Sequence, residues 1–183
     1  MTLKFSSLVI GLGLGLALIQ IVGLLRPGKY AAALRRFSRN TPAGVALMLL
    51  GTAWFVWNLS QESISDFASY KDYLLAGFAA VGLGSCVFVQ DFLAVRGLAV
   101  VFLLLAKLMV DSGRPFLPAT PWVLVIQAWA YVLVVAGIWL TVSPWRMRDF
   151  LNWSAASESR LRFGLILRLI FGLFVAALGF TKF

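Results

Sequence analysis

The feature that most constrains this chain is a series of apolar runs, each close to the length of a membrane span. A helix rises about 1.5 Å per residue, so roughly 20 apolar residues cross a hydrocarbon core of about 30 Å. Apolar and polar residues do not alternate in these runs, as they would in the strands of a transmembrane barrel. The sequence therefore predicts an all-α, polytopic membrane protein with about six transmembrane helices, over residues 6–25, 43–59, 73–90, 93–110, 122–142 and 163–181.

Composition supports this fold class. Of the 183 residues, 61% are hydrophobic and 13% are charged, against about 45–50% and about 25% in soluble domains. A soluble domain of this size has too much surface for its volume to bury so many apolar side chains. Because the spans take up most of the chain, we expect residues 1–183 to form a single transmembrane domain with no separate soluble part.

The first span has some features of a signal peptide, since Lys4 precedes its apolar core. The run is longer than a usual signal core, and the basic segment "RPGKYAAALRRFSR" follows it directly. Positive charge just after an apolar segment resists translocation. We therefore expect a retained first helix.

The distribution of basic residues predicts the orientation. Ten Lys and Arg residues lie in the loops after the first, third and fifth spans, and four lie at the opposite ends of the spans. Basic residues concentrate on the cytoplasmic side of membrane proteins. We expect an integral protein of a bacterial inner membrane with both termini outside.

The stretch "QDFLAVRGLAV" places Asp91 and Arg96 within apolar sequence. Residues 72–112 are long enough for two spans with a tight turn between them, which favours a turn near residues 90–96 at the cytoplasmic face. Asp91 would then cap the next helix, and the head of Arg96 would extend back to the lipid headgroups. The alternative is an intramembrane charged site, which is rare.

Four polar residues within or beside the spans are candidate binding residues: Lys107, Asp111, Gln127 and Arg168. Lys107 and Asp111 are one helical turn apart and could pair. Two interpretations stay open for Lys107 and Arg168, either snorkelling to the headgroups or a buried functional charge. Gln127 could hydrogen-bond a ligand or a neighbouring helix.

Two basic segments resemble each other. Each begins at a proline (Pro27 or Pro144) and continues with basic residues and apolar residues at helical spacing. Such segments are typical of short amphipathic helices in the plane of anionic headgroups. We expect contact with those lipids from Lys29, Arg35, Arg36, Arg39, Arg146 and Arg148. The pattern suggests a repeat, over 6–59 and 122–182, flanking a central hairpin at 73–112, although the positive-inside rule could produce both segments independently.

Small residues at spacing four indicate helix packing. The sequence shows three such faces: Gly11 with Gly15; Ala76, Ala80 and Gly84; and Gly164, Gly172 and Ala176 around Arg168.

Several chemistries are excluded by residue content. The chain has no histidine and one cysteine, Cys86, so histidine-ligated metals and haem, disulfides within the chain and iron–sulfur clusters have no ligands. No two acids lie within one span for acid–base catalysis. We expect no metal, no cofactor and no enzymatic activity, and the basic residues follow topology rather than a nucleic-acid surface.

Three functions remain at this point. The first is a structural or accessory subunit of a larger membrane assembly, with other membrane subunits or further copies of the chain as partners. The second is a small oligomeric transporter or channel for an anion or lipid headgroup, with Lys107, Arg168 and Gln127 along its path. The third is a lipid-modifying enzyme that holds phosphate with Arg or Lys.

Overall fold

The computed structural model describes residues 4–63 and 69–183. In these residues the chain forms eight α-helices and no strand, so the all-α prediction is confirmed. The helices are α1 (Phe5–Leu25), α2 (Pro27–Phe37), α3 (Thr41–Gln61), α4 (Lys71–Phe88), α5 (Leu93–Gly113), α6 (Val123–Val142), α7 (Trp145–Ala155) and α8 (Glu158–Thr181), with a 3-10 turn η2 (Arg114–Phe116) after α5. Within the same described ranges, six of them (α1, α3, α4, α5, α6 and α8) are long and apolar enough to cross a membrane.

The helix ends follow from local sequence. Pro27 begins α2, where its fixed φ suits a first helical residue and its missing N–H costs nothing. Asn40 caps α3, because its side chain accepts a hydrogen bond of 3.2 Å from the backbone N–H of Ala43. The two basic segments are indeed short helices, α2 and α7, of 11 residues each.

The turn predicted near residues 90–96 is confirmed, since α4 ends at Phe88 and α5 begins at Leu93. The prediction that Asp91 caps α5 is wrong, because Asp91 lies one residue before the capping position. Phe92 directly precedes the helix and turns the chain with a φ of 55° in the left-handed region, which few residues with a bulky side chain adopt. Asp91 is an exposed residue of the turn itself.

The chain divides into two compact units. The first comprises Met1–Arg35, Leu105–Leu133 and Arg148–Phe183, and the second comprises Arg36–Leu104 and Val134–Met147. Helices α5 and α6 contribute to both. The expectation of a single transmembrane domain stays a prediction.

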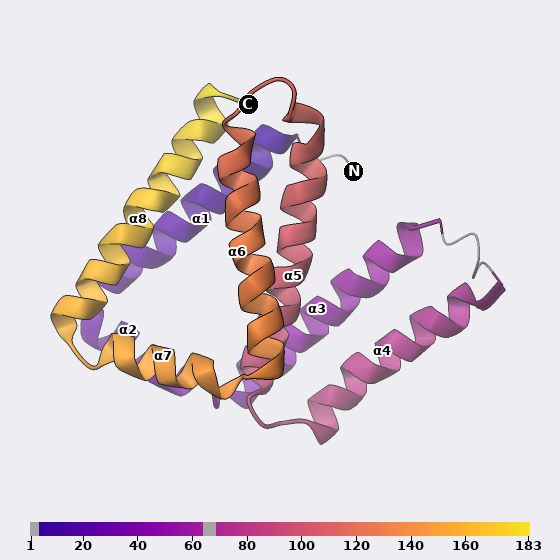
Figure 1. Cartoon of the computed structure of the whole chain (residues 1–183). Coiled ribbons are helices and arrows are strands. Elements are labelled where there is room, and N and C mark those ends of the chain that lie inside the picture. Colours follow the sequence, from indigo (N-terminus) through magenta and orange to yellow (C-terminus); the bar gives the residue numbers. More distant parts are fainter. Residues whose placement is uncertain (1–3, 64–68) are drawn as a thin grey trace. The chain divides into compact units, whose positions relative to one another are not determined.

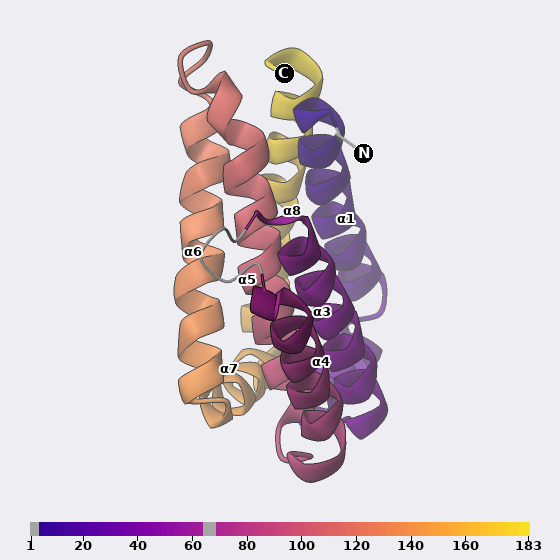
Figure 2. The ribbon, with the colours of Figure 1, turned by 90° about the vertical axis from the view of Figure 1, so that its right-hand side faces the viewer.

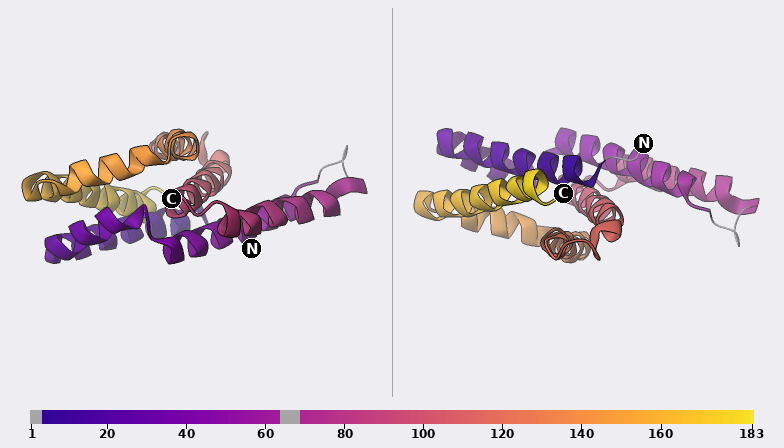
Figure 3. Two further views of the ribbon diagram at one scale, coloured as in Figure 1. Left: turned by 90° about the horizontal axis from the view of Figure 1, so that it is seen from below. Right: turned by 90° about the horizontal axis from the view of Figure 1, so that it is seen from above.

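In the first unit, α1 packs along α8 (Figures 1, 2 and 3). Gly13 lies against the backbone of α8, where an added Cβ would come within 2.7 Å of the carbonyl oxygen of Gly172. The predicted packing role of Gly11 and Gly15 is therefore wrong: no atom lies within 4 Å of the place where their Cβ would be. Gly172 and Ala176 do belong to the packed face of α8, as predicted.

In the second unit, α3 packs closely on α5 and on α4. A Cβ on Gly44 would lie 2.7 Å from the backbone nitrogen of Ala94, and one on Gly97 would lie 2.8 Å from that of Met48. Helix α4 approaches α3 where Gly82 faces Thr52. Close contact of small residues with backbone is the usual way in which membrane helices associate.

Candidate functional site

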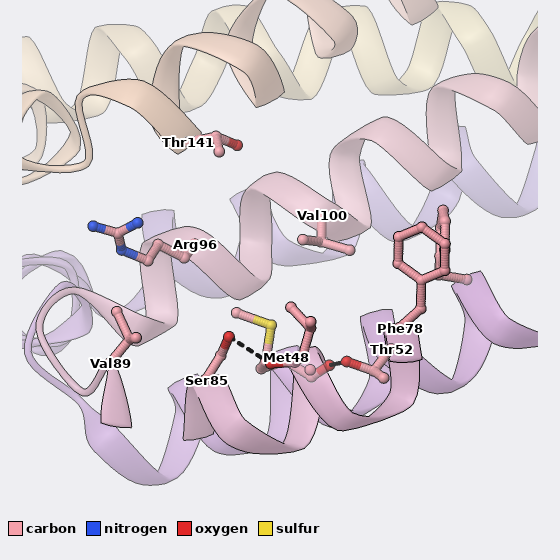
Figure 4. Close-up of a pocket in the computed structure, with 11 residues that line it drawn as sticks. Met48, Thr52, Phe78, Ser85, Val89, Arg96, Val100 and Thr141 are labelled. Atoms are coloured by element: carbon pink, nitrogen blue, oxygen red, sulfur yellow. Dashed lines mark hydrogen bonds between the residues drawn. The ribbon is translucent and has the colours of Figure 1, made fainter. Parts of the chain in front are cut away.

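The second unit contains an open-sided cavity of about 400 Å³ between α3, α4, α5 and the end of α6 (Figure 4). That volume lies within the range of small-molecule sites, about 300–1,000 Å³. Its walls are mostly apolar, formed by Met48, Phe55, Phe78, Val81, Val89 and Val100. The side is open because Val81 and Val89 keep 68% and 39% of their surface exposed.

Three hydroxyl groups also line the cavity, and each donates its proton to its own helix. Thr52, Ser85 and Thr141 donate hydrogen bonds of 2.8 Å to the carbonyl oxygens four residues earlier. Two of these bonds are visible in Figure 4. A hydroxyl that has donated its proton can still accept a hydrogen bond but has none to give. These groups therefore offer a ligand only acceptors.

Arg96 is the one charged side chain among the described residues that line the cavity. It lies in the first turn of α5, and its guanidinium is at the end of the cavity beside Val89 (Figure 4). Its Nε atom is buried and has no hydrogen-bond partner. Because a guanidinium carries five N–H donors, Arg96 supplies the free donors of this cavity.

The four residues predicted to bind within the membrane all belong to the first unit and do not line this cavity. The predicted pair is present: Lys107 Nζ lies 2.7 Å from Asp111 Oδ2, with both side chains about half exposed. Arg168 folds back one turn and donates a hydrogen bond of 2.9 Å from Nε to the carbonyl oxygen of Gly164. Gln127 is partly buried on α6.

The basic residues of the two amphipathic segments are mostly exposed, namely Lys29, Arg35, Arg36, Arg39 and Arg146. Arg35 also donates a hydrogen bond to the carbonyl oxygen of Ala155. Arg148 is partly buried and bonds the carboxylate of Asp149 at 2.9 and 3.0 Å. Their contact with lipid headgroups stays a prediction.

Two residues with unmet hydrogen-bonding capacity were missed by the sequence interpretation. The sequence predicts only that Arg96 reaches the headgroups, and its place in the wall of a cavity depends on how α3, α4 and α6 pack beside α5. Gln20 lies inside the first apolar run, where no role was expected. It is 3% exposed, and its Oε1 has no partner, while its Nε2 donates to the carbonyl oxygen of Leu16 at 3.3 Å.

The outward face of α4 is the second notable feature of this unit. In an apolar stretch of 18 residues in α4, only 6% is buried, against 17–44% of the corresponding stretches in the other five spanning helices. Ala76 and Ala80 are exposed. No atom lies within 4 Å of the position of a Cβ on Gly77, and Gly84 would meet only the ring of Phe88 at 3.9 Å. The predicted small-residue face is thus present, but the packing expected of it within the chain is absent from the described residues.

In comparisons with known proteins, no protein-family model, curated protein or solved structure matches this chain. The described part of the chain contains no group of three or more His, Cys, Asp or Glu residues that could hold a metal ion.

Proposed function

We propose that this integral membrane protein is a non-catalytic subunit of a larger membrane assembly and that the outward face of α4 docks a helix of a partner subunit. We define this α4 docking face by Ala76, Gly77, Ala80 and Gly84. The observation that carries the proposal is that a face of small residues, at helix-packing spacing, is left uncovered on the least buried spanning helix.

The physical reason is the way helices associate in lipid. Lipid tails are as apolar as the side chains, so association depends on close backbone approach, which small residues allow. The same chain uses this device where α1 meets α8: a Cβ on Gly172 would lie 2.9 Å from the carbonyl oxygen of Gly13. The α4 docking face has the same chemistry as that occupied interface, and this supports a partner helix as its occupant.

The absence of enzymatic activity is part of the proposal. Acid–base catalysis needs a positioned proton donor and acceptor near neutral pKa. The described residues that line the cavity include one permanently charged guanidinium and no carboxylate. A bacterial inner membrane, with α2 and α7 at the cytoplasmic surface, is the setting that the distribution of basic residues supports.

A transporter or channel for an anion or lipid headgroup is the second candidate. Its expected path used Lys107, Arg168 and Gln127, and none of them lines the cavity. One observation favours a transporter that uses other residues, because Arg96 lines the cavity and forms no ion pair among the described residues. A non-transporting subunit that binds a ligand in this cavity explains the same observation and needs no continuous path across the membrane, so we place transport second.

The test is photo-cross-linking from single cysteines in native membranes. Ala80→Cys, in a Cys86→Ser background, carries a maleimide–benzophenone probe on the α4 docking face. Leu167→Cys on α8, which is 59% exposed, is the matched control on an apolar surface with bulky side chains. We expect a discrete product with a different membrane protein from position 80, identified by mass spectrometry.

Two results would contradict the proposal. Equal cross-linking from positions 80 and 167 would show that the α4 docking face contacts lipid in the same way as α8 does. Cross-linking from position 80 only to further copies of this chain would replace the mixed assembly with a homo-oligomer.

A further inference from the structure

We propose that the cavity of the second unit binds one anionic phospholipid, with an acyl chain along α4 and the phosphate on Arg96. This site is separate from the α4 docking face. At about 100° per residue, Phe78, Val81 and Ser85 share one side of α4, and Ala76 and Ala80 lie on the opposite side.

The shape of the apolar wall suits an extended chain. The cavity-lining positions run from Phe78 on α4 to Val89, which directly follows the helix, and this is roughly 16 Å at 1.5 Å per residue. Phe55 and Phe78 close the far end with an edge-on ring contact, their centroids 4.9 Å apart. An apolar trough of this length, open on one side, admits a hydrocarbon chain from the bilayer.

The donors in the cavity select an anion. Thr52, Ser85 and Thr141 have each donated their proton to a backbone carbonyl, so a ligand finds free N–H groups only on Arg96. The Nε of Arg96 has no partner among the described residues but is covered by the protein, so a ligand would meet the guanidinium at its two Nη groups, which carry four of its five N–H donors. A phosphate oxygen is a matching acceptor, since guanidinium binds phosphate through two parallel hydrogen bonds.

The predicted topology places Arg96 near the phosphate level of the cytoplasmic leaflet, since the turn before α5 is expected at that face. Arg96 is three residues after the start of α5, roughly 4.5 Å into the helix at 1.5 Å per residue. The turn of residues 89–92 lies at the same end of the cavity. The long side chain of Arg96 spans that short depth, so that a phosphate binds at the membrane surface while the acyl chain enters the hydrocarbon region.

The lining also discriminates between headgroups. A zwitterionic headgroup brings a cation, and no carboxylate lines the described cavity to receive it. The positive charge of Arg96 would repel that cation, whereas a phosphatidylglycerol headgroup brings only the negative phosphate and neutral hydroxyls. We therefore expect a preference for phosphatidylglycerol over phosphatidylcholine.

The experiment is native mass spectrometry of the full chain, taken from nanodiscs that contain equal amounts of phosphatidylglycerol and phosphatidylcholine. We expect one phosphatidylglycerol to be retained per chain. Arg96→Gln removes the charge and should weaken retention by at least about tenfold, as loss of a charge-assisted pair predicts. Arg96→Lys keeps the charge and should retain lipid at an intermediate level.

Two further variants test whether lipid retention depends on this cavity or only on the surface charge of the protein. Arg162→Gln removes one charge from an exposed ion pair with Glu158, and it should retain lipid as the wild type does. Ser85→Phe fills the trough while leaving Arg96 in place, and it should lose the lipid. Far-ultraviolet circular dichroism and gel filtration identify any variant that does not fold, and the remaining variants still decide the question.

Three results would overturn the proposal. Unchanged retention by a folded Ser85→Phe variant would place the lipid outside the cavity. Equal loss from Arg162→Gln and Arg96→Gln would reduce the effect to net charge. Retention of phosphatidylcholine, or of added palmitate in place of phosphatidylglycerol, would remove the phospholipid selectivity. None of these results depends on the α4 docking face, because cross-linking from position 80 is measured separately.

Discussion

Arg35 of α2 donates a hydrogen bond of 2.7 Å from Nη2 to the backbone carbonyl oxygen of Ala155, the last residue of α7. The last carbonyls of a helix have no partner within the helix, and a cation there also meets the negative end of the helix dipole. The two residues are 120 positions apart in sequence. One amphipathic helix thus caps the other, and both belong to the hypothetical repeat.

This contact predicts that Arg35→Gln destabilises the protein. Arg35 is exposed but Ala155 is buried, and a hydrogen bond of this kind contributes about 1 kcal/mol, so we expect a small drop in the temperature of unfolding, measured by circular dichroism in mild detergent. Arg36→Gln is the matched control, since it removes the same charge from the same exposed face of α2. An equal drop in both variants would mean that the charge of α2 matters and the bond does not.

The packing of α1 on α8 predicts opposite results for two neighbouring glycines. Gly13→Ala places a Cβ 2.7 Å from the carbonyl oxygen of Gly172, and overpacking of this kind costs about 1–3 kcal/mol. Gly11→Ala places its Cβ in open space, and alanine has the higher helix propensity. We expect Gly13→Ala to lower the unfolding temperature and Gly11→Ala to leave it unchanged or raise it. The reverse order would show that α1 is rotated about its axis.

The buried side chain of Gln20 predicts a stabilising substitution. Its Oε1 is unsatisfied inside the unit, and such a group costs about 1–3 kcal/mol. Gln20→Met keeps the unbranched shape and removes the polar end, so we expect a higher unfolding temperature. Gln127→Met, at a partly buried position, should have a smaller effect. A marked loss of stability in Gln20→Met would indicate that a bound molecule or a partner protein satisfies Gln20.

The proposed orientation predicts which of two exposed positions can be labelled from outside the cell. In a Cys86→Ser background, Ala119→Cys lies after η2 and Asn152→Cys lies on α7, both at exposed positions. A membrane-impermeant maleimide added to intact cells should label position 119 and leave position 152 unlabelled until the membrane is opened. Labelling of position 152 alone would reverse the topology and place α2 and α7 outside.

The elements of this protein could be predicted from the sequence because lipid leaves the backbone few choices. A run of 20 apolar residues in hydrocarbon must satisfy its own N–H and C=O groups, and a helix does so. The ends of the helices also depend on local sequence, as Pro27 at the start of α2 and Asn40 at the start of α3 show. The pairing of Lys107 with Asp111 needed only the spacing of four residues within one helix.

The rotation of each helix was decided by the tertiary structure. Helix α1 is apolar except for Ser6, Ser7 and Gln20, so hydrophobicity does not distinguish the face of Gly13 from the face of Gly11, about 200° away. The same holds for Arg96, whose surroundings depend on how α3, α4 and α6 pack beside α5. Hydrophobicity determines that these segments are helices in a membrane. Only steric fit between helices determines which side chains meet and where a cavity remains.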